Sequence, residues 1–334
     1  MDRDGKILRL GATVILCATL FRLAGGVFRQ VAAGGIDGEQ IMALAVFLQT
    51  GQVVRHQPLP AEETRPVPTE PVPQATQPDV SQPLVLAKEE LTAVDIQNGT
   101  GETVDIPALT AQGLTWQLRG DAPTVLILHT HATESYTKTE DYVESSAYRT
   151  LDAQYNMVSV GAVLADRLEA AGIGVIHDPT AYDYPSYSGS YNQARQAVEK
   201  HLEENPSIQL VLDLHRDAVE DDSGNQLGYT QETARGTAAR MMIVCGSDAG
   251  GLHYPNWRNN LALGIRMQTV LERQCPGACR PLSLRTGRYN QDLFSNMLLI
   301  EMGAAGNTRQ QALLAAEELA DAIIAMAEGI RVDS

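Results

Sequence analysis

Five short apolar runs recur along the chain after Leu84, separated by stretches with helical periodicity. The runs are VLILH at 125–129, IGVIH at 173–177, QLVLDLH at 209–215, MMIVC at 241–245 and MLLIE at 297–301. A strand with one solvated face would alternate between apolar and polar residues, and these runs do not. They therefore predict five strands that are buried on both faces.

Helical spacing of apolar residues fills the intervals between these runs. It predicts helices over 157–168, ended by Gly172; over 192–204, ended before Pro206; over 257–274; and over 308–330. Buried strands joined by crossover helices favour parallel pairing, with helices packed on both faces of the sheet. The predicted fold class is therefore α/β, a three-layer, mainly parallel open sheet over residues 85–334.

The candidate site residues lie at the ends of three of the apolar runs. His129 and His131 follow the first run, His215 ends the third, and Glu301 ends the last. Because ligands of open α/β sheets bind beyond the carboxyl ends of the strands, we expect these side chains to converge at one edge. Two imidazoles and a carboxylate leave one position of a tetrahedral zinc open for water, and a further carboxylate can act as a base. The pattern indicates a zinc hydrolase site.

Glu134, in the turn after the first run, is the nearest carboxylate in sequence. His129 and His131 would face the same way on an extended chain, and a bend would return the Glu134 carboxylate toward His131. Each residue also has a simpler interpretation: histidines at a strand end often make ordinary hydrogen bonds, and Glu301, ahead of Gly303, could cap a turn. Convergence of several such residues on one edge favours the metal site.

The first 84 residues have a different character from the rest. Residues 1–30 place three basic residues ahead of a largely apolar run, which predicts a signal-anchor with its basic end in the cytoplasm. Arg22 interrupts the run, and cleavage as a signal peptide is the alternative. Residues 31–56 include a candidate amphipathic helix, and residues 57–84 are rich in proline, which favours an extended tether. The layout predicts a single-pass protein of the cell membrane whose 85–334 domain is extracytoplasmic.

Charge and cysteine content exclude two classes of protein. The formal net charge of −16 argues against a nucleic-acid partner, because binding a phosphate backbone needs a basic face. Four cysteines in 334 residues are too few for a fold held together by disulfides, and they include neither a CxxC pair nor a zinc-finger spacing. Cys275 and Cys279, in CPGAC, are either a small disulfide or two free thiols.

Several short motifs, taken together and in order, resemble the stage II sporulation protein P family. They are HTHATESY at 129–136, Asn156 ahead of a helix, DLHRDA at 213–218, PGACRP at 276–281, RYNQDL at 288–293 and LLIEMGAAGNT at 298–308. The resemblance runs from about Leu84 to the C-terminus, and an anchor followed by a proline-rich tether is also this family's layout.

The resemblance carries expectations about fold and function. It implies a fold similar to zinc-dependent N-acetylmuramoyl-L-alanine amidases and an enzyme that cuts stem peptides from the glycan of peptidoglycan during engulfment of the forespore. Cross-link endopeptidase activity is also attributed to this family. A location in the septal or intermembrane space and an assembly with stage II sporulation proteins D and M are implied as well.

The same resemblance assigns the central site residues. His131 and His215 match the two zinc histidines of the wider amidase fold, and Glu301 matches its general base. Glu134 is assigned as the remaining ligand because it lies in the family motif, whereas Asp152 is in reserve because the wider fold takes this carboxylate just ahead of the first long helix. Zinc would activate a water and polarise the scissile carbonyl, while Glu301 moves the proton from the water to the leaving amine.

Further residues are expected in supporting roles. Asp213 shares a face with His215 and should orient it, and His129, like Asp152, is an alternative ligand or supporting residue. Arg216 is assigned to a substrate carboxylate or a developing oxyanion, with an ion pair to Asp217 as the alternative. Substrate contact is assigned to Tyr187 and Tyr191 of AYDYPSYSGSY and to Asn290 of RYNQDL, with surface packing as the alternative for the tyrosines.

Two other classes of function stay open. A different zinc peptidase, such as a carboxypeptidase, can use the same ligands. A non-catalytic cell-wall-binding module can keep the fold without the chemistry. The zinc content of the protein and the fragments it releases from peptidoglycan separate these classes.

Overall fold

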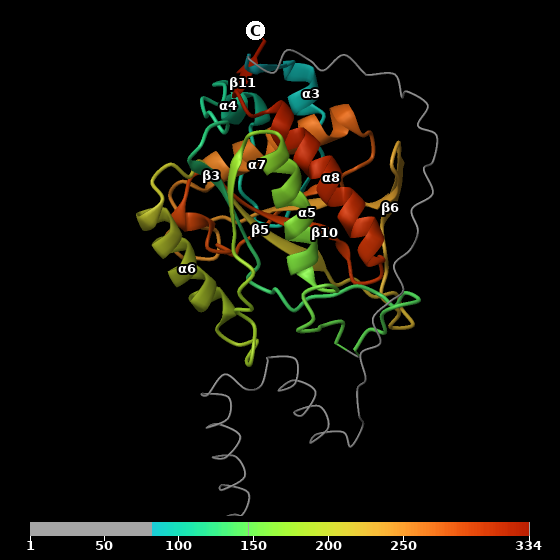
Figure 1. Cartoon of the computed structure of the whole chain (residues 1–334). Helices are drawn as coiled ribbons and strands as arrows, with labels where there is room; N and C mark the ends of the chain where they lie inside the picture. The colour runs from blue at the N-terminus through green and yellow to red at the C-terminus, as the bar shows by residue number, and fades with distance from the viewer. Residues whose placement is uncertain (1–81, 146, 334) are drawn as a thin grey trace, which may run out of the picture. The chain divides into compact units, whose positions relative to one another are not determined.

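The computed structural model of the chain describes residues 82–145 and 147–333 (Figure 1). The predicted signal-anchor, the candidate helix over 31–56 and nearly all of the proline-rich tether lie outside the described residues. Within the described ranges, no helix is both long enough and apolar enough to cross a membrane.

A seven-stranded sheet forms the centre of the domain. From one edge to the other it contains β2 (Ile96–Asn98), β9 (Leu282–Leu284), β8 (Met242–Cys245), β10 (Met297–Ala304), β5 (Leu210–Asp217), β3 (Pro123–Leu128) and β4 (Gly174–His177). Every neighbouring pair in this sheet is parallel except β10 and β8, which are antiparallel. The prediction of a mainly parallel α/β sheet is confirmed.

The reversed direction of β8 follows from what precedes it. Between β5 and β8 the chain forms a hairpin of β6 (Thr230–Thr233) and β7 (Gly236–Ala239) and no helix. A parallel partner needs a crossover that returns the chain to the other end of the sheet, and this hairpin does not provide one. β8 therefore starts at the edge where β5 ends and runs back beside β10, with Glu301 opposite Met242.

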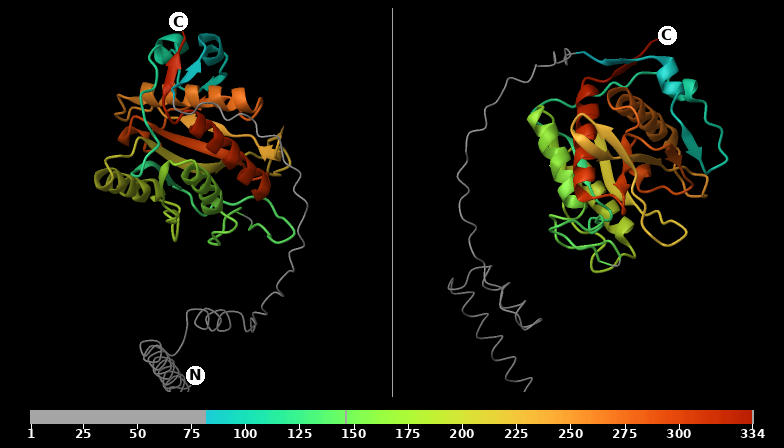
Figure 2. Two further views of the ribbon diagram at one scale, coloured as in Figure 1. Left: turned by 45° about the horizontal axis from the view of Figure 1, so that its top comes forward. Right: turned by 90° about the vertical axis from the view of Figure 1, so that its right-hand side faces the viewer.

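Helices cover both faces of the sheet. On one face α5 (Met157–Ala170), α7 (Trp257–Gln274) and α8 (Arg309–Ala325) share a core with alternate residues of the strands. On the other face α6 (Ser190–Glu204) packs on the intervening residues of β3 and β5. Figures 1 and 2 show α5 and α8 side by side. The predicted three-layer arrangement is therefore present.

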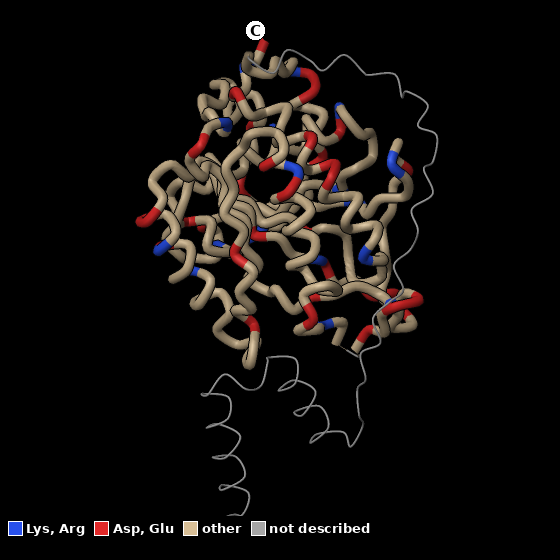
Figure 3. The backbone as a smooth tube through the Cα atoms, viewed as in Figure 1, with Lys and Arg blue, Asp and Glu red and all other residues tan. Residues whose placement is uncertain are grey.

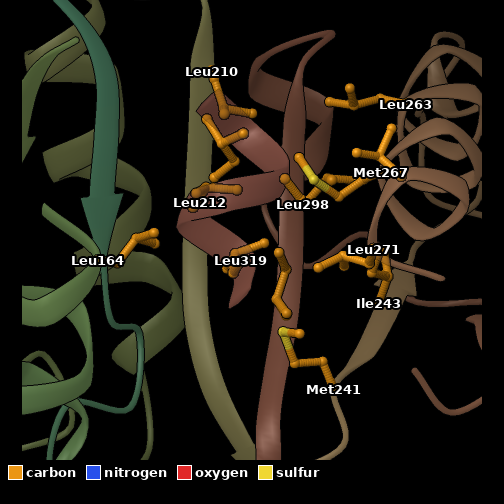
Figure 4. Close-up of a cluster of buried hydrophobic side chains, with 14 of the residues drawn as sticks. Leu164, Leu210, Leu212, Met241, Ile243, Leu263, Met267, Leu271, Leu298 and Leu319 are labelled. Atoms are coloured by element: carbon orange, nitrogen blue, oxygen red, sulfur yellow. The ribbon is translucent and has the colours of Figure 1, made fainter. Parts of the chain in front are cut away.

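The larger core is aliphatic and lies under α5, α7 and α8. Leu212 of β5 is opposite Leu298 of β10, and both are fully buried. Figure 4 shows these leucines packed with Leu319 of α8 and with Met267 and Leu271 of α7. Each such side chain contributes about 1.5–3 kcal/mol by leaving water, so the face away from α6 supplies most of the stabilisation by burial.

Bounds of the predicted elements agree with the structure to within three residues, except near the C-terminal end of the domain. α7 has the predicted bounds, and α5 begins after Asn156, whose side chain accepts a hydrogen bond from the Val158 amide. The helix predicted over 308–330 is too long: α8 ends at Ala325, and β11 (Ile330–Val332) pairs with β1 (Leu84–Leu86). The pattern did not predict β1, β2, β6, β7, β9, α3 (Lys88–Thr92) or α4 (Ile106–Thr110).

Charged side chains are confined to one part of the sheet. Among its seven strands only β5 and β10 carry Asp, Glu, Lys or Arg, namely Asp213, Arg216, Asp217 and Glu301. Figure 3 shows the other charged residues of the described part distributed around this sheet. Because β5 and β10 are parallel neighbours, their charged residues lie together at the same edge.

Cys275 and Cys279 are buried free thiols, so the disulfide that the sequence left open is not formed.

Gly161 of α5 lies close against two histidine rings beneath the helix. A Cβ at this position would lie 2.5 Å from His129 Nε2 and 2.6 Å from His177 Nε2. Replacing glycine by alanine inside a helix normally stabilises it by about 1 kcal/mol. Here we expect Gly161→Ala to destabilise the fold by about 1–3 kcal/mol, because the two rings must be displaced.

Denaturant unfolding of the two proteins measures this difference. Glu169→Ala, at an exposed position of the same helix, is the control and should shift the unfolding free energy by no more than about 0.5 kcal/mol. A Gly161→Ala protein more stable than wild type would show that α5 does not pack against these histidines as described.

Candidate functional site

Four of the predicted site residues meet at the carboxyl ends of β3, β5 and β10. His215 and Glu301 are Cα partners in the β5–β10 ladder, and their side chains therefore share a face. The turn after β3 brings His131 and Glu134 to the same place. All four are at least nine-tenths buried, with exposed fractions of 5% for His131, 5% for Glu134, 4% for His215 and 9% for Glu301. Neither β5 nor β10 ends at its site residue, because β5 continues to Asp217 and β10 to Ala304.

His215 lies between two carboxylates. Its Nδ1 is 3.6 Å from Glu134 Oε2, and its Nε2 is 3.0 Å from Asp213 Oδ1. The first distance is too long for a hydrogen bond, and the second approach is not aligned as one. Burial disfavours the charged ring, but the two carboxylates outweigh it and raise the pKa of His215 well above its usual value. The imidazole is therefore held as a cation.

Asp213 is the fixed member of this group. It is fully buried, and its carboxylate accepts hydrogen bonds from the Thr130 amide at 2.8 Å and the Thr130 hydroxyl at 2.6 Å. These bonds join β5 to the turn after β3. The structure places Asp213 where the sequence predicted it, beside the ring of His215.

Glu134 is ionised despite its burial. Its Oε1 lies 3.2 Å from Arg149 Nη2, and its Oε2 accepts a hydrogen bond from the Arg216 amide at 3.2 Å. Burial alone would raise the pKa of this carboxyl, but His215 and Arg216 lower it to about 2. Oε2 thus carries negative charge toward His215.

Glu301 has the opposite character. Its Oε2 is buried and has no hydrogen-bond partner. Burial, together with the charges of Glu134 and Asp217, raises the pKa of Glu301 to about 8. A carboxyl that is nearly neutral at pH 7, in a site that contains other carboxylates, is typical of residues that transfer protons.

His131 completes the group from the other side. The centroid of its ring is 5.1 Å from that of His215, and the two rings are nearly perpendicular. Its Nδ1 is buried without a hydrogen-bond partner. Burial, with the charge of His215 nearby, lowers the pKa of His131 to about 4, so this ring is neutral and has a lone pair to offer.

Whether these residues could hold the predicted zinc depends on their spacing and on their chemistry. With the side chains as they stand, residues 82–145 and 147–333 contain no group of three or more His, Cys, Asp or Glu spaced to hold a metal ion. The donor set nevertheless fits zinc: His131 offers an unpartnered buried nitrogen, and the 3.6 Å between Glu134 Oε2 and His215 Nδ1 is close to the ~3.4 Å expected between two ligands of a tetrahedral zinc. Asp213 beside the other nitrogen of His215 is the partner that metal-binding histidines usually have.

Two predicted alternatives do not belong to the site. His129 does not face the same way as His131, because β3 ends at Leu128 and the chain turns directly afterwards. The His129 ring is instead buried under α5, with Nε2 2.9 Å from His177 Nε2 and Nδ1 3.2 Å from the Leu214 carbonyl. Asp152 is exposed, and its carboxylate accepts a hydrogen bond from the Gln154 amide in a local turn.

Arg216 is engaged with the backbone. Its Nε donates to the Ser135 carbonyl at 2.9 Å and its Nη2 to the Tyr148 carbonyl at 2.8 Å. These hydrogen bonds stabilise the turn that carries Glu134. The alternative ion pair with Asp217 is wrong, because Asp217 pairs with Arg280 at 2.7 Å.

The segment that leads into α6 and the first turn of α6 each contribute an aromatic ring. Tyr187 is stacked on His131, with ring centroids 4.3 Å apart and planes inclined by 16°, although more than half of its surface is exposed. The Tyr191 ring centroid is 5.5 Å from that of His131 and 6.4 Å from that of His215. The Asn290 side chain donates to the Tyr191 carbonyl at 2.8 Å, so it contacts the backbone of this tyrosine.

The pattern analysis missed two charged residues that adjoin the site. Arg149 approaches Glu134 from the loop that precedes α5, and Asp183 approaches Arg149 from the segment that precedes α6. Both segments lie toward the lower end of the domain in Figure 1. Arg149 belongs to no periodic pattern or short motif, whereas Asp183 lies within AYDYPSYSGSY, where the tyrosines alone were assigned to the site.

A cavity of about 490 Å³ lies elsewhere, between α7 and the 277–281 loop. Its lining contains none of His131, Glu134, His215 or Glu301. Its charged groups are largely engaged already; Glu272, for example, accepts hydrogen bonds from the amides of Gly277 and Cys279. The clustered histidines and carboxylates, rather than this cavity, are the candidate active site.

Comparison with known proteins gives one family and several weaker likenesses. A model of the family described as stage II sporulation protein P matches residues 49–324. The curated stage II sporulation protein P of Bacillus subtilis (strain 168) is 28% identical over 220 residues, which cover 61% of this chain and 51% of that protein. This chain thus spans about half the length of that curated relative.

Two solved structures of N-acetylmuramoyl-L-alanine amidases are similar to this chain. AmiC2 of Nostoc punctiforme is 12% identical, with 61% of this chain and 97% of that chain covered and a TM-score of 0.37. The amidase from Clostridium difficile 630 is 14% identical, with 62% and 97% covered and a TM-score of 0.37. A likeness of this strength leaves fold and chemistry to be argued from this chain's own residues.

Proposed function

The chain belongs to the stage II sporulation protein P family, and from its site we propose that it is a peptidoglycan hydrolase acting in sporulation. The bond that it cleaves in this proposal is the amide between N-acetylmuramic acid and the L-alanine of the stem peptide. The observation that carries the proposal is the meeting of His131, Glu134 and His215 with a neutral, unpartnered Glu301 at one sheet edge.

Zinc is part of the same proposal, with His131, Glu134 and His215 as the residues that would hold it. When bound, it would supply a Lewis acid that polarises the scissile carbonyl and activates water. A cation also suits the charges of the site. Glu134 and Asp213 are both ionised, and the proton that they hold on His215 offsets part of their negative charge. A bound metal ion would offset this charge in place of the proton.

Glu301 is the proton carrier of this mechanism. It projects from β10 on the face of His215, and in its ionised form its unpartnered oxygen accepts the proton of the attacking water. The same group then returns that proton to the departing amine, which would otherwise leave as an unstable anion. Its raised pKa suits both steps, because a group that titrates near the working pH both takes and gives a proton readily.

Tyr187 and Tyr191 form the wall of the site toward α6. Their rings lie beside His131 and present flat surfaces, the exposed Tyr187 most of all. A saccharide or peptide lying in the site would pack against these rings. Substrate contact therefore rests on Tyr187 and Tyr191, whereas Asn290 acts on the position of Tyr191.

The ligand assignment predicts that the full chain binds one zinc. Elemental analysis of purified protein should show near-stoichiometric zinc in wild type and its loss in His215→Ala, because one imidazole of the set is removed. His253→Ala, which removes an exposed histidine outside the site, is the matched control and should keep the metal. Equal zinc in the His215→Ala and wild-type proteins would show that the ligand set is wrong.

The role of Glu301 predicts a separation of chemistry from metal binding. Glu301→Gln keeps the shape of the side chain but cannot accept a proton, so release of stem peptides from purified peptidoglycan should fall by at least ~10²-fold while zinc and fold are retained. Glu134→Gln, at a proposed ligand, should weaken zinc retention as well.

Mass analysis of the released fragments measures this activity. It also distinguishes amidase products from endopeptidase or carboxypeptidase products by their termini. Near-wild-type turnover in Glu301→Gln would place the base elsewhere. Loss of zinc from that variant would make Glu301 a ligand.

Location and partners belong to the same proposal. The basic residues ahead of the apolar run in 1–30 support an extracytoplasmic location for residues 85–334. Peptidoglycan, the proposed substrate, lies on that side of the membrane. Protease added to intact, wall-stripped cells should then degrade residues 85–334, whereas protection equal to that of cytoplasmic controls would reverse the orientation.

The resemblance adds stage II sporulation proteins D and M as partners, and their copurification with the full chain tests this.

A further inference from the structure

A short antiparallel bridge places Arg149 directly opposite Glu134. The Ser135 amide donates to the Tyr148 carbonyl at 2.9 Å, and the Thr150 amide donates to the Thr133 carbonyl at 2.8 Å. Between these two hydrogen bonds, Glu134 and Arg149 are paired residues. Side chains of paired residues project from the same side of such a bridge, so the backbone itself presents Arg149 to Glu134.

The guanidinium of Arg149 binds two carboxylates from different parts of the chain. Its Nη2 is 3.2 Å from Glu134 Oε1, and its Nη1 is 2.6 Å from Asp183 Oδ2. Asp183 also accepts a hydrogen bond from the Thr133 hydroxyl at 2.6 Å. The planar, permanently charged guanidinium suits such a bridge, since its two terminal nitrogens point in fixed directions.

The same guanidinium contacts the aromatic wall of the site. Its central carbon lies 4.5 Å from the ring centroid of Tyr187, which is stacked on His131. Asp183 and Tyr187 both belong to the segment that precedes α6. One side chain therefore contacts the carboxylate of the proposed metal site and, at two points, the segment that covers His131.

We propose that Arg149 is a positioning residue that couples the orientation of Glu134 to the closure of residues 178–189 over His131. This proposal rests on the proposed function, because Glu134 matters as a metal ligand. By holding Oε1, Arg149 leaves Oε2 directed at His215. Because the same guanidinium also contacts Asp183 and Tyr187, the position of the Tyr187 ring over His131 is linked to the orientation of Glu134.

An ordinary surface ion pair would not have this effect. Exposed pairs contribute little, because water and salt screen them. Here the Asp183 side chain is fully buried and that of Glu134 is 7% exposed, while the Arg149 side chain is 27% exposed. Among the ion pairs of residues 82–145 and 147–333, Arg149 is the partner of the buried Asp183. Removing it leaves that carboxylate without a paired charge, and Glu134 loses the contact that holds Oε1 while it keeps the charges of His215 and Arg216.

The first test is the zinc affinity of the full chain, measured by competition with a chelator. Arg149→Gln should weaken zinc binding by about 10–100-fold, the range for partners that orient metal ligands. Asp183→Asn should weaken it similarly although Asp183 does not contact Glu134, and the double variant should be no weaker than Arg149→Gln alone. Arg149→Lys should be intermediate, because one ammonium cannot bridge both carboxylates in the same geometry.

Asp178→Asn is the matched control within the same segment. Asp178 accepts a hydrogen bond from the Tyr182 hydroxyl at 2.6 Å and lies 2.9 Å from His201 Nε2, away from Arg149. Its replacement should change zinc affinity less than about twofold. Zinc affinities of Arg149→Gln and Asp183→Asn equal to that of wild type would overturn the proposal, as would fully additive losses in the double variant.

A second readout does not depend on metal. In chelator-treated full chain, amide hydrogen exchange of residues 178–189 and 133–135 should accelerate together in Arg149→Gln. Acceleration of one segment without the other, or of neither, would overturn the coupling. A wild-type protein that binds no zinc would overturn the proposed function, and this exchange measurement would still decide the role of Arg149.

Discussion

The charged group formed by Asp213, His215 and Glu134 is the constraint on which the rest of the site depends. Three ionised side chains share a place from which water is nearly excluded, and burial of this kind is costly unless the charges compensate one another. The proton on His215 provides that compensation in the metal-free molecule. A metal must displace this proton, so zinc affinity is expected to rise with pH.

The surrounding elements supply and hold these charges. The parallel neighbours β5 and β10 bring His215 and Glu301 onto one face, and the Thr130 hydrogen bonds join the turn after β3 to Asp213. Arginines then fix the turn, one through backbone carbonyls and one through the Glu134 carboxylate. The Glu301 carboxyl has an oxygen without a hydrogen-bond partner, and burial raises its pKa to about 8, so it can both take and give a proton.

Most of the layered fold could be predicted because burial on both faces leaves a direct trace in the sequence. The five apolar runs all form strands, and α7 has the predicted bounds. Strand direction leaves a weaker trace: β8 is antiparallel because no helix separates it from β5, an absence that the apolar run itself does not record. The end of α8 was misjudged because the apolar pattern continues into β11, whose partner β1 is more than 240 residues away in sequence.

The site was predictable where it depends on strand register and unpredictable where it depends on turns. Residues two apart on β5 share a face, so Asp213 lies beside His215 as expected. The same rule fails for His129 and His131, because the strand has ended before them. Tyr187 was expected at the site, but Arg149, from the loop before α5, and Asp183, from the segment before α6, were not, and only the folded chain brings them together.

Anomalous diffraction at the zinc absorption edge, from crystals of the protein grown with zinc, would show whether a metal completes this charged group. We expect a single anomalous peak within bonding distance of His131, Glu134 and His215, with Glu301 close to the metal but not bound to it. A peak at the His129 and His177 pair, at Asp152, or at no site on the domain would contradict it.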